Sequence, residues 1–304
     1  MTASSSDAPI SEAAMSEAAM SEATAAAMAA AGLVPGQSPA PLRLPGAAIF
    51  ARRAARLLAL AEGHAMGDWL RFVATLADAQ TAVAATPATL PPEEQWAADL
   101  RALAARLDSL SGGARDALTA LAASDTDTLE ALAGRWAGDA LEDGDLAAAP
   151  FLAAAFQTAW TRHAAALDPA SVTTHATATA CPVCGGAPVA GVLQVGMESG
   201  GLRYLHCGIC HTAWHHVRSS CVACGDGKDV SQRFVEGADG TEANGAVRAE
   251  TCDACHSYLK LLFLDKAPGL DPVADDLATL ALDLLLGEEE YRRIGVNPFL
   301  AVAG

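Results

Sequence analysis

Cys181-Pro-Val-Cys184 is the first of four short motifs that decide how the second half of this 304-residue chain folds. A tetrahedral metal with metal–sulfur bonds of about 2.3 Å needs neighbouring sulfurs roughly 3.8 Å apart, and a tight CxxC turn supplies two of them. The motif occurs four times and uses all eight cysteines, which we expect to ligate two metal ions, four cysteines each: Cys181, Cys184, Cys207, Cys210, Cys221, Cys224, Cys252 and Cys255.

The gaps between successive pairs are 22, 10 and 27 residues long. Grouping the first pair with the second, and the third with the fourth, encloses a hairpin-sized insert in each group. Apolar stretches at 189–195 and 202–206, and at 230–235 and 247–251, flank Gly-containing turns, so each insert predicts a β-hairpin. A crossed grouping stays open, because spacing alone does not fix which cysteines share a metal.

Four thiolates leave no open position for water, so such a metal braces a small fold or cycles one electron rather than hydrolysing a substrate. The ligand set fits iron or zinc equally. Eight cysteines already satisfy two sites, so the nearby histidines are expected at the surface or behind the ligands: His206, His211, His215, His216 and His256.

Two pairs have Gly185 and Gly225 directly after the second cysteine, where a positive φ lets backbone N–H groups turn toward the sulfurs. The other two read CxxCH, ending at His211 and His256, a pattern also used for covalent haem attachment. Haem is disfavoured because the N-terminus has no secretory signal and the CxxCG pairs would have no role. Disulfides and thiol exchange are disfavoured by a reducing compartment and by the presence of four pairs.

Composition and charge limit the kinds of fold and partner that this chain can have. Hydrophobic residues make up 52% of the chain and aromatic residues only 5%, which is typical of Ala- and Leu-rich packed helices. Neither a secretory signal nor an uncharged apolar run of membrane-spanning length is found, so we expect a cytoplasmic protein without membrane insertion. The net charge is −17, and residues 181–264 hold six Lys/Arg against eight Asp/Glu, which argues against nucleic acid as a partner.

The pattern predicts an α+β protein: an N-terminal all-α bundle, two small rubredoxin-like or zinc-ribbon modules and a C-terminal helix. Apolar residues at helical spacing predict five to seven helices. Candidates are the segments 47–63, 93–110, 114–123, 126–137 and 151–167, and a helix that carries Trp69, Leu70, Phe72, Val73 and Leu76. We divide the chain into a disordered low-complexity tail (1–40), a helical domain (41–170), a first metal module (178–220), a second metal module (221–264) and a C-terminal helix with its tail (265–304).

The C-terminal helix has its own signals. Asp275 and Asp276 favour a helix start. An apolar stripe is expected to pack on one of the domains: Leu277, Leu280, Ala281, Leu284 and Leu285.

Longer motifs around the cysteines resemble the formate dehydrogenase accessory proteins of the FdhE family. The resemblance rests on His206-Cys207-x2-Cys210-x3-Trp214-x3-Arg218-x2-Cys221-x2-Cys224-Gly225, on Glu250-x-Cys252-x2-Cys255-x2-Tyr258-Leu259-Lys260, and on segments near 41–72 and 274–298. It implies a non-catalytic maturation factor that binds the catalytic subunit of formate dehydrogenase, with a rubredoxin-like module holding iron. Trp214, Arg218, Tyr258 and Lys260 are motif positions that packing also explains.

The leading functional hypothesis is therefore an assembly factor, because no GxSxG, HExxH, P-loop or GxGxxG motif is present. The alternative is a rubredoxin-like redox protein that transfers electrons during cofactor insertion. A nucleic-acid-binding zinc ribbon is a third reading, disfavoured by charge. The sequence leaves open whether the chain forms a homodimer.

Overall fold

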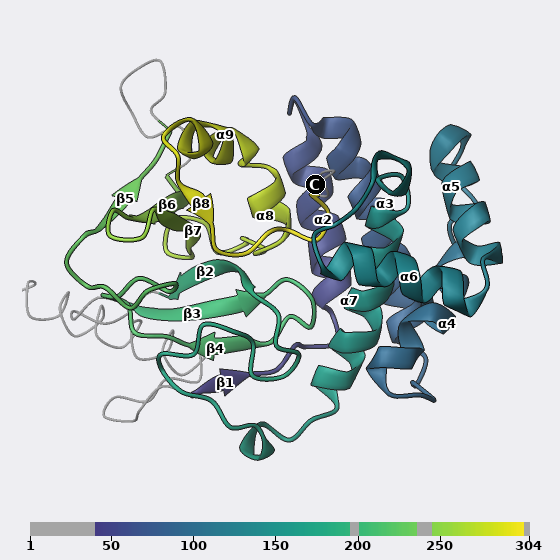
Figure 1. The fold of residues 1–304 in the computed structure, drawn as a ribbon, viewed down its shortest axis with the longest axis horizontal. Helices are drawn as coiled ribbons and strands as arrows, with labels where there is room; N and C mark the ends of the chain where they lie inside the picture. Colours follow the sequence, from purple (N-terminus) through teal and green to yellow (C-terminus); the bar gives the residue numbers. More distant parts are fainter. Residues whose placement is uncertain (1–39, 195–200, 236–244, 301–304) are drawn as a thin grey trace, which may run out of the picture.

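The computed structural model describes residues 40–194, 201–235 and 245–300, so most of the low-complexity tail expected at 1–40 lies outside the described residues. Helices occupy one half of the molecule and a sheet the other (Figure 1). The helical half contains α2 (Ile49–Ala61), α3 (Gly67–Ala84), α4 (Pro92–Ala104), α5 (Gly112–Ala123), α6 (Thr126–Ala137) and α7 (Ala149–Ala165). Each corresponds to a helix predicted from apolar spacing.

The largest difference from a predicted helix boundary lies at the end of α4. The segment 93–110 was expected to continue to Leu110, but α4 ends at Ala104. Gly112 has a φ of +59° and begins α5 rather than stopping the preceding helix. Leu107 stays buried beyond the helix end, which explains why the apolar spacing continued past Ala104.

The sheet is built from short strands, most of them antiparallel. The strands are β1 (Leu42–Arg43), β2 (Pro188–Gln194), β3 (Leu202–Cys207), β4 (Ala213–His215), β5 (Val230–Arg233), β6 (Val247–Cys252), β7 (Ser257–Phe263) and β8 (Arg292–Arg293). Pairing of β2 with β3 and of β5 with β6 confirms the two predicted hairpins.

The two hairpins belong to one sheet with the order β1-β4-β3-β2-β7-β6-β5, and β8 pairs with β7. Strands β2 and β7 join the halves in parallel, with Val192 opposite Leu262. At one edge β1, which precedes every described helix in sequence, pairs with β4. The two expected metal modules therefore share one continuous sheet.

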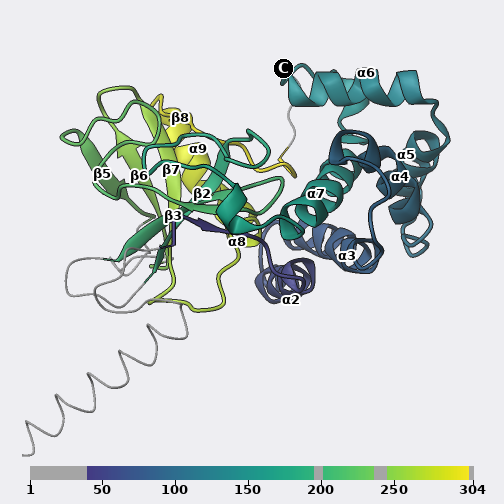
Figure 2. The same cartoon turned by 90° about the horizontal axis from the view of Figure 1, so that it is seen from below.

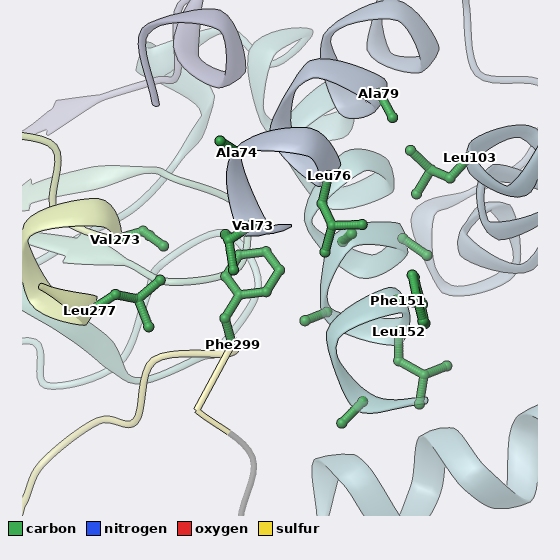
Figure 3. Close-up of a cluster of buried hydrophobic side chains, with 14 of the residues drawn as sticks. Val73, Ala74, Leu76, Ala79, Leu103, Phe151, Leu152, Val273, Leu277 and Phe299 are labelled. Atoms are coloured by element: carbon green, nitrogen blue, oxygen red, sulfur yellow. The ribbon is translucent and has the colours of Figure 1, made fainter. Parts of the chain in front are cut away.

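A single hydrophobic core runs from the helices to the sheet. Val73 of α3, Leu277 of α8 (Ala274–Leu277), Val273 directly before α8, and Phe299 converge in this core (Figure 3). Helix α7 and helix α2 lie on the side of the helical half that faces the sheet (Figure 2). Twelve of the 17 residues of α7 are buried, many of them alanines, whose small side chains let neighbouring elements approach closely.

The C-terminal segment corrects a prediction. Instead of one helix, α8 is followed by α9 (Leu280–Glu288), and the predicted stripe is wrong because Leu284 and Leu285 are 65% and 46% exposed. Leu282 and Leu286 are buried in their place. The break at Ala278–Thr279 changes the face that α9 presents, and Lys260 of β7 stabilises it by donating to the carbonyl oxygens of Asp276 and Thr279.

Candidate metal centres

The first four-cysteine group comes from the two ends of the first hairpin. Cys181 and Cys184 lie in the turn before β2, and Cys207 and Cys210 lie at the end of β3 and in the turn that follows. The Sγ atoms of Cys181 and Cys210 are 3.4 Å apart, and those of Cys184 and Cys207 are 3.3 Å apart. All four ligand atoms lie within 4.8 Å of one another, so the group is positioned to bind a metal ion.

The second group repeats this arrangement at the ends of the second hairpin. Cys221 and Cys224 precede β5, Cys252 ends β6, and Cys255 lies in the turn between β6 and β7. The Sγ pairs Cys221–Cys255 and Cys224–Cys252 are both 3.7 Å apart, close to the roughly 3.8 Å edge of a tetrahedral thiolate site. The grouping of first with second and third with fourth pairs is thereby confirmed, and the crossed grouping is wrong.

All four CxxC turns share one backbone feature. The residue after the second cysteine has a positive φ in every case: Gly185 (75°), His211 (58°), Gly225 (78°) and His256 (51°). The amides of Gly185 and Gly225 each donate to the carbonyl of the first cysteine of their pair, at 2.9 Å. The predicted positive φ of both glycines is confirmed, and the CxxCH histidines adopt the same left-handed conformation.

The electrostatics of both groups fit a bound cation. In the first group, hydrogen bonds from the other three thiols hold the pKa of Cys181 far below its usual range, and the neighbouring sulfurs raise the pKa of Cys210. One thiolate therefore opposes the ionisation of a second, and a metal charge would remove that opposition. In the second group burial opposes ionisation of Cys221, but amide N–H groups and the Ser257 hydroxyl outweigh it and lower the pKa to about 7.

The two groups differ in exposure. Cys181, Cys207 and Cys210 are buried, whereas Cys224 and Cys255 of the second group are exposed. Ser257 Oγ lies 2.9 Å from the Cys255 sulfur and 3.6 Å from the Cys221 sulfur, on the inner side of the second group.

The turn of Cys207 and Cys210 is bound to the helical half. Gln157 of α7 donates to the Gly208 carbonyl at 2.7 Å, and Thr161 Oγ1 lies 2.7 Å from His211 Nδ1. Arg53 of α2 is fully buried, donates to Gln157 and forms an ion pair with Asp271 at 3.0 Å. Motif reading missed this buried polar network, whose members lie far apart in sequence.

All eight histidines of the chain lie in the described part, and neither metal-ligand group includes one. His211 is buried, and its ring meets Phe50 edge-on at 5.5 Å between centroids. His216 Nδ1 lies 2.8 Å from the Arg203 guanidinium. His256 is exposed. These positions agree with the expectation that histidines surround the ligands rather than replace them.

The four motif positions separate into two kinds. Trp214 is buried beside the first group and donates to the Ala178 carbonyl at 2.8 Å. Tyr258 donates to Asp283 at 2.7 Å, and Lys260 is buried among carboxylates and carbonyls, so these three positions hold the fold together. Arg218 is exposed and lines a cavity of about 460 Å³ near the second group.

Within the described residues, no helix combines the length and apolar content needed to cross a membrane.

Family models and relatives match nearly the whole described chain. The models are FdhE, N-terminal (residues 39–101 and 86–177), FdhE, central domain (180–218) and FdhE, C-terminal domain (219–300). A Protein FdhE homolog from Pseudomonas aeruginosa is 38% identical over 88% of this chain and 94% of the relative, and one from Cronobacter sakazakii is 36% identical over 83% and 88%.

The fold is also that of a solved relative. The crystal structure of the FdhE protein from Pseudomonas aeruginosa superposes with a TM-score of 0.78 and 34% identity, covering 86% of this chain and 99% of that one. By sequence, by domain order and by fold, this chain belongs to the FdhE family.

Proposed function

We propose that the chain is a non-catalytic accessory factor that binds the catalytic subunit of formate dehydrogenase and supports its assembly into active enzyme. Membership of the FdhE family, with family models matching from residue 39 to residue 300, carries this proposal. In this role the protein acts in the cytoplasm, where its eight thiols stay reduced.

We further propose that the eight cysteines of the two groups are the metal ligands. Each group supplies four sulfurs at tetrahedral spacing, so the coordination sphere is complete without water or substrate. An ion of iron or zinc would cross-link the two CxxC turns of each hairpin. The metals then brace the sheet that presents the partner-binding surface.

Co-purification tests the proposed partner. The tagged full-length chain is expressed in a bacterium that makes formate dehydrogenase and is then purified. In parallel, a strain that lacks the gene for this chain is compared with the same strain after complementation. The catalytic subunit is expected in the eluate, and formate oxidation should fall in the deletion strain. Absence of the subunit together with unchanged formate oxidation would remove the proposal.

A further inference from the structure

Arg218 lines the cavity near the second metal group together with Ser219, Val230, Ser231, Gln232 and Glu250. We call this cavity the Arg218 pocket. Its volume of about 460 Å³ lies within the range of ligand-binding pockets in proteins. Its serine hydroxyls and the Gln232 amide offer hydrogen-bond donors beside the guanidinium.

Among the described residues that line the pocket, Arg218 is the one cation, and its charge lies close enough to Glu250 to favour that carboxylate. Glu250 forms an ion pair with Arg203, whose buried guanidinium also lies 2.8 Å from His216 and 2.7 Å from the Ser220 carbonyl. The Arg218 guanidinium makes no hydrogen bond or ion pair with any residue that the structure describes. The wall of the pocket therefore complements a single negative charge, and a carboxylate matches it better than a doubly charged phosphate would next to Glu250.

The pocket also opens on an unpaired strand edge. Strand β5 is the last strand of the sheet and pairs only with β6 among the described strands. It lies on the side of the sheet away from the helices (Figure 1). Val230, Ser231 and Gln232 are consecutive in β5, and successive side chains point to opposite faces, so the pocket meets this strand along its edge. Such an edge can pair with an extended peptide through backbone hydrogen bonds.

We propose that β5 and the Arg218 pocket together bind an extended polypeptide segment whose acidic side chain forms a bidentate ion pair with Arg218. The inference names the chemistry of the partner segment, and in that respect it rests on the proposed function. It gives Arg218 a role in binding, unlike the three buried motif residues around it.

Peptide binding to the isolated full-length, metal-loaded chain tests the proposal. The probe is a fluorescein-labelled peptide, acetyl-Val-Thr-Glu-Thr-Val-amide, and the matched peptide carries Gln in place of Glu. Fluorescence anisotropy should show about tenfold tighter binding of the Glu peptide, because its carboxylate forms a charge-assisted bidentate contact with the guanidinium that the Gln amide cannot form. Methylation of the threonine backbone nitrogens should weaken binding, because it removes the donors that pair with β5.

Variants assign the binding to the pocket. Arg218→Ala should bind both peptides equally weakly, Arg218→Lys should retain part of the preference for Glu, and Arg52→Ala, an exposed arginine of α2, should behave as the unmodified chain. Preference for Glu in Arg218→Ala, or equal binding of the Glu and Gln peptides by the unmodified chain, would overturn the proposal. Free glutarate and inorganic phosphate should displace the labelled peptide only at much higher concentrations than the unlabelled peptide does. Displacement at equal concentrations would also overturn the proposal.

These measurements contain no formate dehydrogenase. Failure of peptide binding therefore overturns the pocket proposal without changing the result of co-purification. Loss of the catalytic subunit from the eluate of an Arg218→Ala variant that also loses the peptide would connect the two proposals.

Discussion

Arg53 is the residue on which the junction between the helices and the sheet depends most directly. Its buried guanidinium contacts Asp271 before α8 and Gln157 of α7. Arg53→Met removes the cation and leaves a buried carboxylate without its partner, so we expect a loss of about 3–5 kcal/mol in the free energy of unfolding. Urea unfolding followed by circular dichroism measures the change.

Two further variants test that explanation. Arg52→Ala, one residue away but exposed, should change stability by no more than about 0.5 kcal/mol. In the double variant Arg53→Met, Asp271→Asn, the total loss should be smaller than the sum of the two single losses, since the unpaired charge is gone. Additive losses would show that the ion pair is not the reason for the destabilisation.

His256 tests whether the CxxCH ending reflects backbone conformation or ligation. Its φ of 51° is the left-handed conformation that glycine adopts without strain, and its side chain is exposed. His256→Gly should keep both metals with unchanged or slightly higher stability, whereas His256→Val should cost about 1–2 kcal/mol. Metal analysis of the purified variants provides the measurement. Loss of the second metal in His256→Gly would show that the imidazole is a ligand.

At the scale of residues, local signals predicted the arrangement of the eight cysteines into two groups of four and the positive φ of Gly185 and Gly225. The equivalent conformation of His211 and His256 was not predicted, because histidine after CxxC also suggests ligation or haem attachment. The contacts of Arg53 with Gln157 and Asp271 carry no local signal, since each joins residues more than 100 positions apart in the chain.

At the level of elements, the break between α8 and α9 depends on a lysine from a strand. Lys260 of β7 lies 2.5 Å from Asp283 and donates to carbonyl oxygens on both sides of the break. Lys260→Met removes one of the two cations that pair with the buried carboxylates of Asp276 and Asp283, leaving only Arg293. We therefore expect a loss at the lower end of about 3–5 kcal/mol, with α9 detaching first. Hydrogen exchange should become fastest in α9, while Lys228→Met, at an exposed lysine, should leave exchange unchanged.

The same contact explains why helix existence was predicted better than helix orientation. Apolar spacing identified the six helices of the first half, because each buries a regular stripe. For α9 the stripe of Leu284 and Leu285 was wrong, since Lys260 ends α8 from outside the segment and shifts the buried face to Leu282 and Leu286. A tertiary contact of this kind is absent from local periodicity.

On the scale of the whole molecule, the sheet joins segments that the sequence presents as separate. Strand β1 precedes the helices, yet it pairs with β4, and β2 pairs in parallel with β7 about 70 residues later. Hairpins were predictable from adjacent strands and turns, but long-range pairing has no comparable local signature. The first metal group consequently lies at the junction of both halves, and the second lies at the surface.

This difference predicts two classes of metal. The second metal should leave first when the protein is treated with a thiol-binding mercurial and a coloured chelator, because Cys224 and Cys255 are exposed. The first metal should leave only as the junction unfolds, since three of its four ligands are buried and Gln157 of α7 holds the turn between Cys207 and Cys210. Absorbance should therefore rise in a fast and a slow phase of equal size. Cys224→Ser should abolish the fast phase and keep the protease resistance of the helical half. A Cys181→Ser, Cys184→Ser double variant should lose that resistance. Release of both metals in a single phase would contradict unequal sites.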